Sequence, residues 1–212
     1  MDKSKSKGKY FDKIKPVLRK NRFSQLNMDD MARHMDISKA TLYKYFSSKD
    51  EIITMFVEHC VDYFERADGL IANPNLSYSE RFQKTYEHSL KAVIYTPDFL
   101  LQDLKEIYPH LHDSLMLAQL ERIRSLVKFF EAGTAAGVFN PINATMFMVQ
   151  DDVVLRRILE PSFTIQFDLT LKKSLIDFYM LKKYQLFAAE YLHTVDDSPM
   201  EKEIALIIQQ IS

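Results

Sequence analysis

Residues 27–53 read NMDDMARHMDISKATLYKYFSSKDEII and contain the pattern of two short helices joined by a tight turn. Asn27 can cap the first helix, and Asp30, three positions later, can complete a capping box. Asp36 and Ile37 make the turn, after which Ser38 can cap the second helix. Residues 27–46 therefore predict a helix-turn-helix.

Each of the two short helices has one narrow apolar face. Met31 and Met35 lie four positions apart on the first helix, as do Leu42 and Phe46 on the second. The outward positions of the second helix carry amines and a flat ring: Lys39, Ala40, Tyr43 and Lys44. Such a face suits the major groove of DNA, where some side chains reach base edges while their neighbours hold phosphates.

The run ISKATLYKYFSSKDEII, residues 37–53, closely resembles the recognition helix and following helix start of TetR-type (tetracycline-repressor-like) transcriptional regulators. Its specific part is Leu-Tyr-x-x-Phe followed two positions later by Ser-Lys, and the resemblance covers about residues 10–57. It implies an all-α fold, with a three-helix DNA-binding domain at residues 1–54 and a helical effector-binding and dimerisation domain at residues 55–212. The implied function is a ligand-responsive repressor, acting as a homodimer on a palindromic operator in double-stranded DNA.

Carried over by position, the resemblance also implies DNA contacts. The residues that correspond to base contacts are Lys39, Ala40 and Tyr43. Those that correspond to phosphate contacts are Thr41, Tyr45 and Lys49, and Lys44 fits either role.

Four positions depart from the family's usual pattern. Asp36 replaces a turn glycine and is expected to adopt the left-handed conformation, which aspartate tolerates. Arg22 stands where a helix-ending glycine is common, so Asn21 beside it is expected to take the strained position. Pro16 is expected to kink or shorten the first helix. Leu26 replaces a polar residue.

Charge is distributed unevenly along the chain. Residues 1–50 contain 13 Lys/Arg and 6 Asp/Glu, so the totals of 28 and 29 leave 15 basic and 23 acidic residues for the remainder. A basic end that also carries a groove-facing helix is typical of a DNA-binding protein. The lysines at positions 3, 5, 7 and 9 fit either a solvated tail or a flexible arm on the phosphate backbone.

Composition narrows the class of protein further. With 212 residues and 47% hydrophobic residues the chain can bury a substantial core. Cys60 is the single cysteine and is expected to be buried and inert. The polar, basic start does not resemble a signal peptide, and no run approaches the roughly 20 apolar residues of a membrane helix. A cytoplasmic location without membrane attachment is the resulting expectation.

Few glycines and three further capping patterns, beginning at Ser48, Ser77 and Ser198, predict helices throughout. The expected helices cover about residues 48–67, 77–96, 98–108, 109 to the 133–137 region, 141–160, 168–193 and 198 to the end, with a break at 69–74. The helices at 141–160 and 168–193 carry an apolar surplus: Phe147, Val154, Leu155, Ile158, Leu175, Phe178, Leu181, Leu186 and Tyr191. By pattern alone this surplus fits dimerisation and closure of the bundle equally, and the resemblance favours a four-helix dimer interface.

A pocket for a small hydrophobic or amphipathic effector is expected in the same bundle, lined by Tyr86, His88, Tyr108, Phe129 and Met148. Its expected volume is roughly 300–1,000 Å³, although the same residues could close a solid core. Asp151 and Asp152 fit either a polar spot in that cavity or a pair answered by Arg156.

No cofactor, metal site or catalytic residue is indicated. His110 and His112 are two positions apart and point to different sides of a helix. Glycine loops that hold phosphate, nucleophile elbows and paired cysteine motifs are absent. The alternatives to a regulator are an all-helical interaction protein without specific DNA binding and, less favoured, a helical enzyme.

Overall fold

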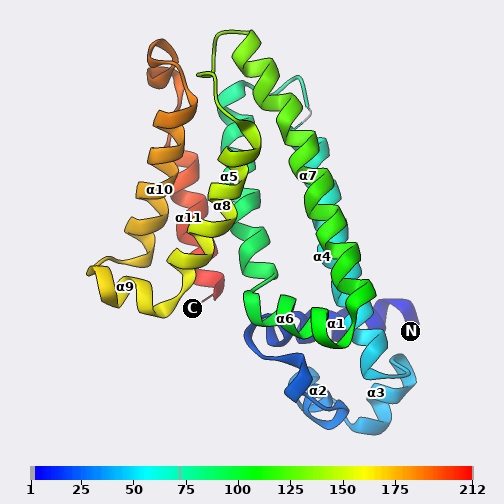
Figure 1. Cartoon of the computed structure of the whole chain (residues 1–212). Coiled ribbons are helices and arrows are strands. Elements are labelled where there is room, and N and C mark those ends of the chain that lie inside the picture. The colour runs from blue at the N-terminus through cyan, green and yellow to red at the C-terminus, as the bar shows by residue number, and fades with distance from the viewer. Residues whose placement is uncertain (1–2, 72, 212) are drawn as a thin grey trace. The chain divides into compact units, whose positions relative to one another are not determined.

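The computed structural model describes residues 3–71 and 73–211, which are helical apart from short connections and one isolated bridge between Phe139 and Phe187 (Figure 1). This confirms the all-α prediction. The helices are α1 (Lys3–Lys20), η1 (Phe23–Gln25), α2 (Met28–Met35), α3 (Lys39–Tyr45), α4 (Lys49–Ile71), α5 (Tyr78–Tyr95), α6 (Asp98–Ile107), α7 (Pro109–Ala135), α8 (Ala144–Leu159), α9 (Pro161–Phe167), α10 (Leu171–Leu186), η2 (Ala189–Thr194) and α11 (Ser198–Ile211).

The chain forms two compact units. The first unit comprises Met1–Tyr63 with Tyr95–Ala118, and the second comprises Phe64–Ile94 with Gln119–Ser212. Helix α4 runs without a break past residue 54, where the resemblance places the domain boundary. That boundary stays a prediction.

Local capping interactions fix several helix starts. Asn27 and Asp30 form the expected capping box on α2, and the Ser38 side chain accepts from the Thr41 N–H at the start of α3. Ser77 and Glu80 cap α5 reciprocally, with distances of 2.8 and 3.2 Å. Each cap satisfies an amide that lacks a partner within its own helix, so these starts follow from neighbouring residues alone.

The departures from the family pattern are accommodated in different ways. Asp36 adopts the expected left-handed conformation, with φ of 60°. The expectation for Asn21 was wrong: its φ is not positive, and its side-chain amide donates to the Val17 carbonyl at 2.9 Å. Helix α1 also continues past Pro16 to Lys20, so the expected shortening was wrong. Proline removes one amide, and neighbouring backbone bonds carry the helix past it.

The N-terminal lysines are not a flexible arm in the described residues, because α1 begins at Lys3. Lys7 forms an ion pair with Glu51 at the start of α4, and its ammonium lies 5.4 Å from the centre of the Phe46 ring. Both partners are on elements of the helix-turn-helix region. Met1, Asp2 and the side chains at positions 3 and 5 lie outside the part that the structure describes.

The first unit packs α1, α2, α3 and the start of α4 around one core, and α6 packs against η1. Asp103 of α6 is only 2% exposed and accepts from Arg22 Nη1 at 2.9 Å and from the Ser24 N–H at 3.0 Å. Arg22 therefore links α6 to the segment that follows α1. It does so from a position where the family usually has a helix-ending glycine. The fully buried side chains of this core are Ile14, Leu18, Phe23, Met31, Met35, Leu42, Phe46 and Ile52.

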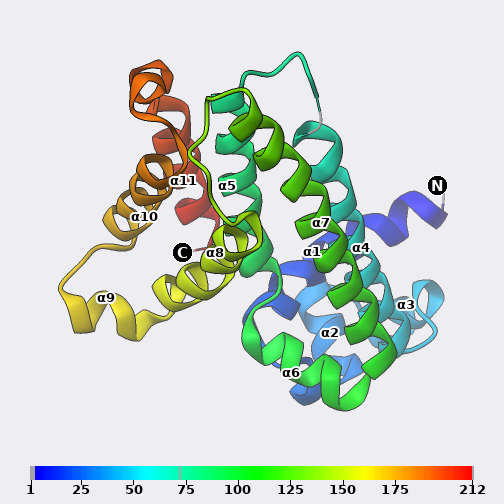
Figure 2. The same ribbon diagram turned by 45° about the horizontal axis from the view of Figure 1, so that its top comes forward.

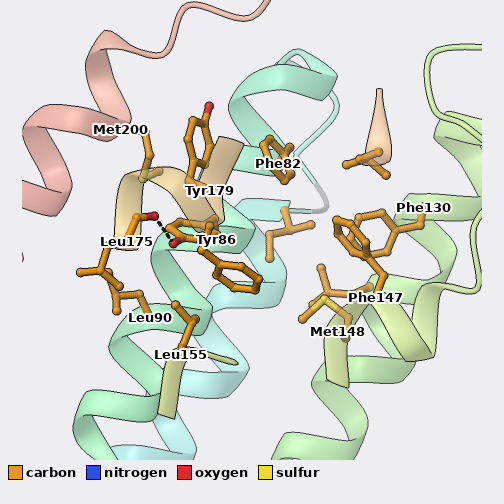
Figure 3. Close-up of a cluster of buried hydrophobic side chains, with 14 of the residues drawn as sticks. Phe82, Tyr86, Leu90, Phe130, Phe147, Met148, Leu155, Leu175, Tyr179 and Met200 are labelled. Atoms are coloured by element: carbon orange, nitrogen blue, oxygen red, sulfur yellow. Dashed lines mark hydrogen bonds between the residues drawn. The ribbon is translucent and has the colours of Figure 1, made fainter. Parts of the chain in front are cut away.

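The second unit is a helical bundle with an aromatic core, drawn in Figure 3. Phe82 and Tyr86 of α5 pack on Tyr179 of α10, with ring centres 5.5 and 5.3 Å apart. The buried Tyr86 hydroxyl donates to the Leu175 carbonyl at 2.6 Å. A hydroxyl placed this deep needs such a partner, because an unpaired polar group in the core is costly.

A glycine permits the close turn after α7. A Cβ on Gly133 would lie 2.0 Å from the Phe139 ring, so only glycine fits beneath that side chain. Gly137, with φ of 71°, completes the turn. Phe139 is then held over the helix end and joins the aromatic core.

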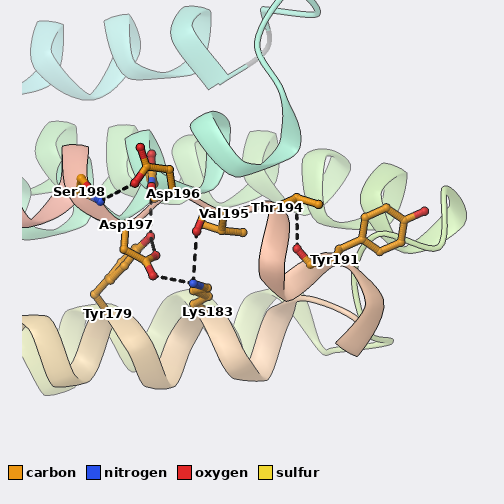
Figure 4. Close-up of polar contacts among 9 residues, drawn as sticks. Tyr179, Lys183, Tyr191, Thr194, Val195, Asp196, Asp197 and Ser198 are labelled. Carbon is orange, nitrogen blue, oxygen red and sulfur yellow. Dashed lines mark hydrogen bonds and ion pairs between the residues drawn. The ribbon is translucent and has the colours of Figure 1, made fainter.

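The connection from α10 to α11 is held by polar contacts (Figure 4). Asp197 accepts from Tyr179 at 2.8 Å and pairs with Lys183 at 2.6 Å. Gln83 of α5 donates to the Asp196 carbonyl at 2.6 Å. The predicted helix at 168–193 accordingly ends at Leu186, and the chain turns back through η2 before α11 begins.

Most of the apolar surplus on α8 and α10 is core. Phe147, Leu155, Ile158, Leu175, Phe178 and Leu186 are buried within the second unit, so assigning them to a dimer surface was wrong. These positions point toward neighbouring helices of the same chain. The large apolar side chains that these two helices expose are Met146, Val149, Val153, Leu181 and Tyr184.

Candidate nucleic-acid interface

Helix α3 lies beside α2 in the first unit (Figure 2). One face of α3 is exposed. Leu42 is fully buried against the core, whereas Lys39, Ala40, Tyr43 and Lys44 are exposed. Tyr43 exposes 49% of its surface, so its ring and hydroxyl are accessible to a partner. The arrangement gives a short helix with a buried inner side and an available outer side, as groove binding requires.

One contact links the two helices of the motif on their exposed side. The Lys39 ammonium lies 2.9 Å from a carboxylate oxygen of Asp29, which raises the pKa of Lys39. Both side chains are more than half exposed, so this ion pair is worth little and a DNA phosphate or base edge can replace Asp29.

The three positions that correspond to phosphate contacts are more enclosed. Thr41 shares a hydrogen bond of 2.9 Å with the Ser38 hydroxyl, and the Tyr45 ring lies 5.1 Å from that of Tyr10. Lys49 is half-buried at the start of α4, and this burial lowers its pKa, while Asp103 and Asp50 oppose the shift. These contacts fix the orientation of side chains at the edge of the exposed face.

Two contacts near this face were not anticipated from the sequence. Lys7 lines a shallow groove of about 640 Å³ together with Tyr43, Lys44 and Glu51. The carboxylate of Asp29 pairs with Lys39 and so lies beside the exposed face of α3. The lysine-rich start of the chain signalled the first, but nothing local showed that α1 would bring Lys7 to α3.

The second unit contains a cavity of about 180 Å³, smaller than expected from the sequence. Of the five residues expected to line a pocket, Met148 is in its wall. Tyr86 and Phe129 belong to the aromatic core, and His88 is buried on α5. Tyr108 lies in the first unit, where its hydroxyl donates to Asp50.

Both interpretations of the paired aspartates apply: both residues line the cavity, and Asp152 also pairs with Arg156. Asp152 accepts from Arg156 at 3.0 Å, one turn further along α8. Asp151 is 3% exposed and lines the cavity, with its carboxylate 2.9 Å from the Lys182 ammonium and accepting from Ser89 at 2.7 Å. Part of the cavity lining therefore consists of charged side chains that form hydrogen bonds with their neighbours.

Because His88 is buried, we expect the free energy of unfolding to depend on pH. Burial, reinforced by the charge of Arg122, lowers the pKa of His88 from 6.5 to about 3. Between these values the unfolded chain binds a proton that the folded chain does not, so stability falls as the pH drops from 6.5 toward 3. The slope from this group is up to about 1.4 kcal/mol per pH unit.

Urea unfolding at several pH values checks this expectation. His88→Gln should flatten the curve over that window, and His110→Gln, at an exposed position on α7, should leave it unchanged. Equal slopes for wild type and His88→Gln would contradict the assignment.

Three features of the described residues bear on nucleophilic catalysis, metal binding and membrane insertion. Burial raises the pKa of the Cys60 thiol to about 12, so this cysteine is a poor nucleophile. Among the described residues, no three histidine, cysteine or acidic side chains gather where they could hold a metal ion. No helix in the same residues is long and apolar enough to cross a membrane.

A capped helix-turn-helix with an exposed basic and aromatic second helix defines a DNA-binding protein. Residues 17–54 match the family model described as bacterial regulatory proteins, tetR family. Over this DNA-binding segment the chain is similar to transcriptional regulators of the TetR family. The family consists of regulators rather than enzymes.

Named relatives agree with this assignment. The chain is 28% identical over 126 residues to the biofilm operon icaADBC negative transcriptional regulator IcaR of Staphylococcus epidermidis, covering 52% of this chain and 67% of that protein. The fold resembles that of a regulator from Saccharomonospora viridis solved with choline (TM-score 0.68, 14% identity, 87% of this chain and 99% of that one). It also resembles the ketosteroid regulator KstR2 of Mycobacterium tuberculosis (TM-score 0.64, 16% identity, 86% and 95%).

Proposed function

We propose that the protein is a homodimeric repressor that binds a palindromic operator through α3 of each subunit and responds to a small effector bound in the second unit. The observation that carries the DNA-binding part is the exposed face of α3, with Lys39, Ala40, Tyr43 and Lys44 above a buried Leu42. Repression is supported by the negative regulation that the name of the Staphylococcus relative states. A protein of this function acts where the chromosome lies, in the cytoplasm.

Two recognition helices in one dimer would read two half-sites of the operator. Half-sites that are read from one face of B-DNA are about 34–36 Å apart or a multiple of that distance. An effector that binds one dimer geometry more tightly than another shifts the protein toward that geometry. Operator affinity then falls when the favoured spacing of the two α3 helices no longer matches the DNA.

Selection from a random DNA pool tests specific binding directly. We expect the enriched sequences to share an inverted repeat, and the affinity for that repeat to exceed the affinity for scrambled DNA at 200 mM salt by roughly 10³-fold or more. An interaction protein with a merely basic surface would bind DNA weakly at low salt, lose that binding as salt rises, and enrich no common sequence.

A dimer in solution is expected from the exposed apolar side chains of α8 and α10. Met146, Val149 and Val153 recur on one side of α8, and Leu181 and Tyr184 are exposed on α10, which packs against α8. Two copies of this surface related by a two-fold axis would form the four-helix interface that the resemblance implies. Sedimentation equilibrium should give about twice the chain mass of 24.9 kDa at micromolar concentration.

A charge on this surface should break the dimer. Leu181→Glu places a carboxylate at a position that is 65% exposed in the single chain, so it should leave the fold intact and shift the protein to monomer. Leu206→Glu, at a 52% exposed leucine on α11, is the matched control and should remain dimeric. A monomeric wild type, or a dimeric Leu181→Glu variant, would contradict the proposed interface.

A further inference from the structure

A shallow groove of the first unit is lined by the start of α1, by α3 and by the start of α4, and is called the α1–α3 groove below. Its volume is about 640 Å³. Tyr43 and Lys44 line it and also belong to the exposed face of α3. Lys7 of α1 and Glu51 of α4 line it as well. The α1–α3 groove therefore continues the candidate DNA-binding face toward α1.

Two contacts hold the start of α1 beside α3. The Tyr10 ring lies 5.1 Å from the Tyr45 ring, and the Lys7 ammonium lies 5.4 Å from the centre of the Phe46 ring. Lys7 and Tyr10 are three positions apart, so they share one side of α1. The place of Lys7 at the groove is therefore set by the packing of a folded helix.

The α1–α3 groove carries a net positive charge, although one acid lines it. The Glu51 carboxylate pairs with Lys7, and it accepts from the Ser47 N–H at 2.6 Å and from the Ser47 hydroxyl at 2.8 Å. The hydrogen bonds from Lys7 and Ser47 lower the pKa of Glu51 to about 2, so it stays ionised. Lys44 is exposed and forms no ion pair with any residue that the structure describes. Two ammonium groups against one carboxylate suit an anionic partner.

Pairing with Glu51 leaves Lys7 able to bind a second acceptor. An ammonium has three N–H donors, and Glu51 accepts from one of them. The two side chains are 30% and 29% exposed, and ion pairs that reach solvent contribute only about 0–1 kcal/mol. Lys7 can therefore keep Glu51 as the partner that orients it while another N–H donates to a phosphate oxygen.

The dimensions of DNA indicate what would enter the α1–α3 groove. An α-helix with its side chains is about 10–12 Å across, and the major groove is about 12 Å wide. A helix seated there has a sugar-phosphate strand along each side, so the side chains that flank it meet phosphates. Lys7 flanks α3 beside Lys44 and Tyr45.

We propose that the α1–α3 groove receives the backbone of one operator strand, and that Lys7 binds a phosphate of that strand together with Lys44. The proposal rests on the proposed function, because it adds α1 to the same DNA-binding surface.

Phosphate ethylation interference on the selected operator tests for this contact directly. For wild type, ethyl groups on a set of phosphates in each half-site should block binding. For Lys7→Gln, interference at one phosphate of each half-site should disappear while the rest of the pattern remains. An interference pattern identical to that of wild type would overturn the proposal.

Salt dependence gives a quantitative readout. Each phosphate contact contributes about 0.9 to the slope of log affinity against log salt, so Lys7→Gln should reduce the slope of a dimer by about 1.8. Lys20→Gln removes the same charge at an exposed position about 20 Å further along α1, beyond the Debye length of about 10 Å at 0.1 M salt. This matched control should keep the wild-type slope. An unchanged slope in Lys7→Gln, or an equal decrease in Lys20→Gln, would contradict the proposal.

Glu51→Gln separates a DNA contact from a role in folding. Glutamine keeps an oxygen that can accept from Ser47 but lacks the negative charge beside Lys7. If Lys7 binds phosphate, this variant should bind the operator at least as tightly as wild type does. If Lys7 acts only by pairing with Glu51, Glu51→Gln and Lys7→Gln should weaken binding alike, and the proposal is wrong.

Selection from the random DNA pool keeps the inference distinct from the proposed function. If wild type selects an inverted repeat while Lys7→Gln retains the wild-type slope and interference pattern, only the inference is wrong. If wild type selects no common sequence, the proposed function fails and the inference fails with it.

Discussion

Tyr43→Ala is expected to weaken operator binding strongly while leaving the protein folded. The Tyr43 ring is half exposed on α3 and lies beside Lys39 and Lys44 on the face assigned to the major groove. Loss of one base contact costs about 1–3 kcal/mol, and a dimer loses it at both half-sites, so the operator complex should lose about 2–6 kcal/mol. Gel shift with the selected operator measures this loss.

Sequence preference distinguishes a base contact from a general loss of affinity. Tyr43→Ala should relax the preference at one position in each half-site, which a second selection from the random DNA pool would reveal. Lys49→Ala, at a position matched to phosphate binding, should weaken all sequences about equally and reduce the salt dependence. Lys128→Ala, an exposed lysine of the second unit, is the control and should bind as wild type does. Wild-type affinity in Tyr43→Ala would show that α3 is not the recognition helix.

Asp151→Ala is expected to destabilise the second unit by about 3–5 kcal/mol, because it removes one partner of a buried ion pair. The Lys182 side chain is 2% exposed, its ammonium lies 3.2 Å from the centre of the Phe147 ring, and burial lowers its pKa while Asp151 opposes that shift. Without the carboxylate, the ammonium stays buried and keeps the neutral Phe147 carbonyl and Gln150 amide oxygen as acceptors, but loses the negative charge beside it. Urea unfolding at pH 7 measures the change.

A matched pair of variants separates burial from charge. Asp152→Ala removes the neighbouring carboxylate, which is 54% exposed and pairs with Arg156, and should cost no more than about 1 kcal/mol. Asp151→Leu combined with Lys182→Met replaces both charges by apolar groups and should recover most of the loss. If Asp151→Ala costs no more than Asp152→Ala, the buried pair does not have the energetic role assigned here.

The prediction from sequence succeeded where partners are close in the chain. The caps at Asn27, Ser38 and Ser77 each involve residues within three positions, and all three form as expected. It failed for Asn21, whose φ is not positive, and it did not anticipate that Arg22 binds Asp103, which lies 81 positions away on α6. A residue pair of that separation leaves no periodic signal in one sequence.

The same contrast applies to the candidate sites. The exposed face of α3 follows from the spacing of Leu42 and Phe46, so its outward residues could be named from the sequence alone. The cavity could not be placed in this way, and only Met148 among the five expected residues lines it. Helix periodicity shows which side of a helix is apolar, but not which apolar side leaves a gap against its neighbours.

By itself, then, the sequence determined the helical class, the helix-turn-helix and the outward-facing residues of α3, because caps and apolar spacing act over three or four positions. Only the tertiary structure decided that Asp151 meets Lys182, that Lys7 reaches Phe46 and Glu51, and that most apolar residues of α8 and α10 are core. These features depend on the register in which distant helices pack. That register is set by the fit of many side chains together and cannot be read from any one segment.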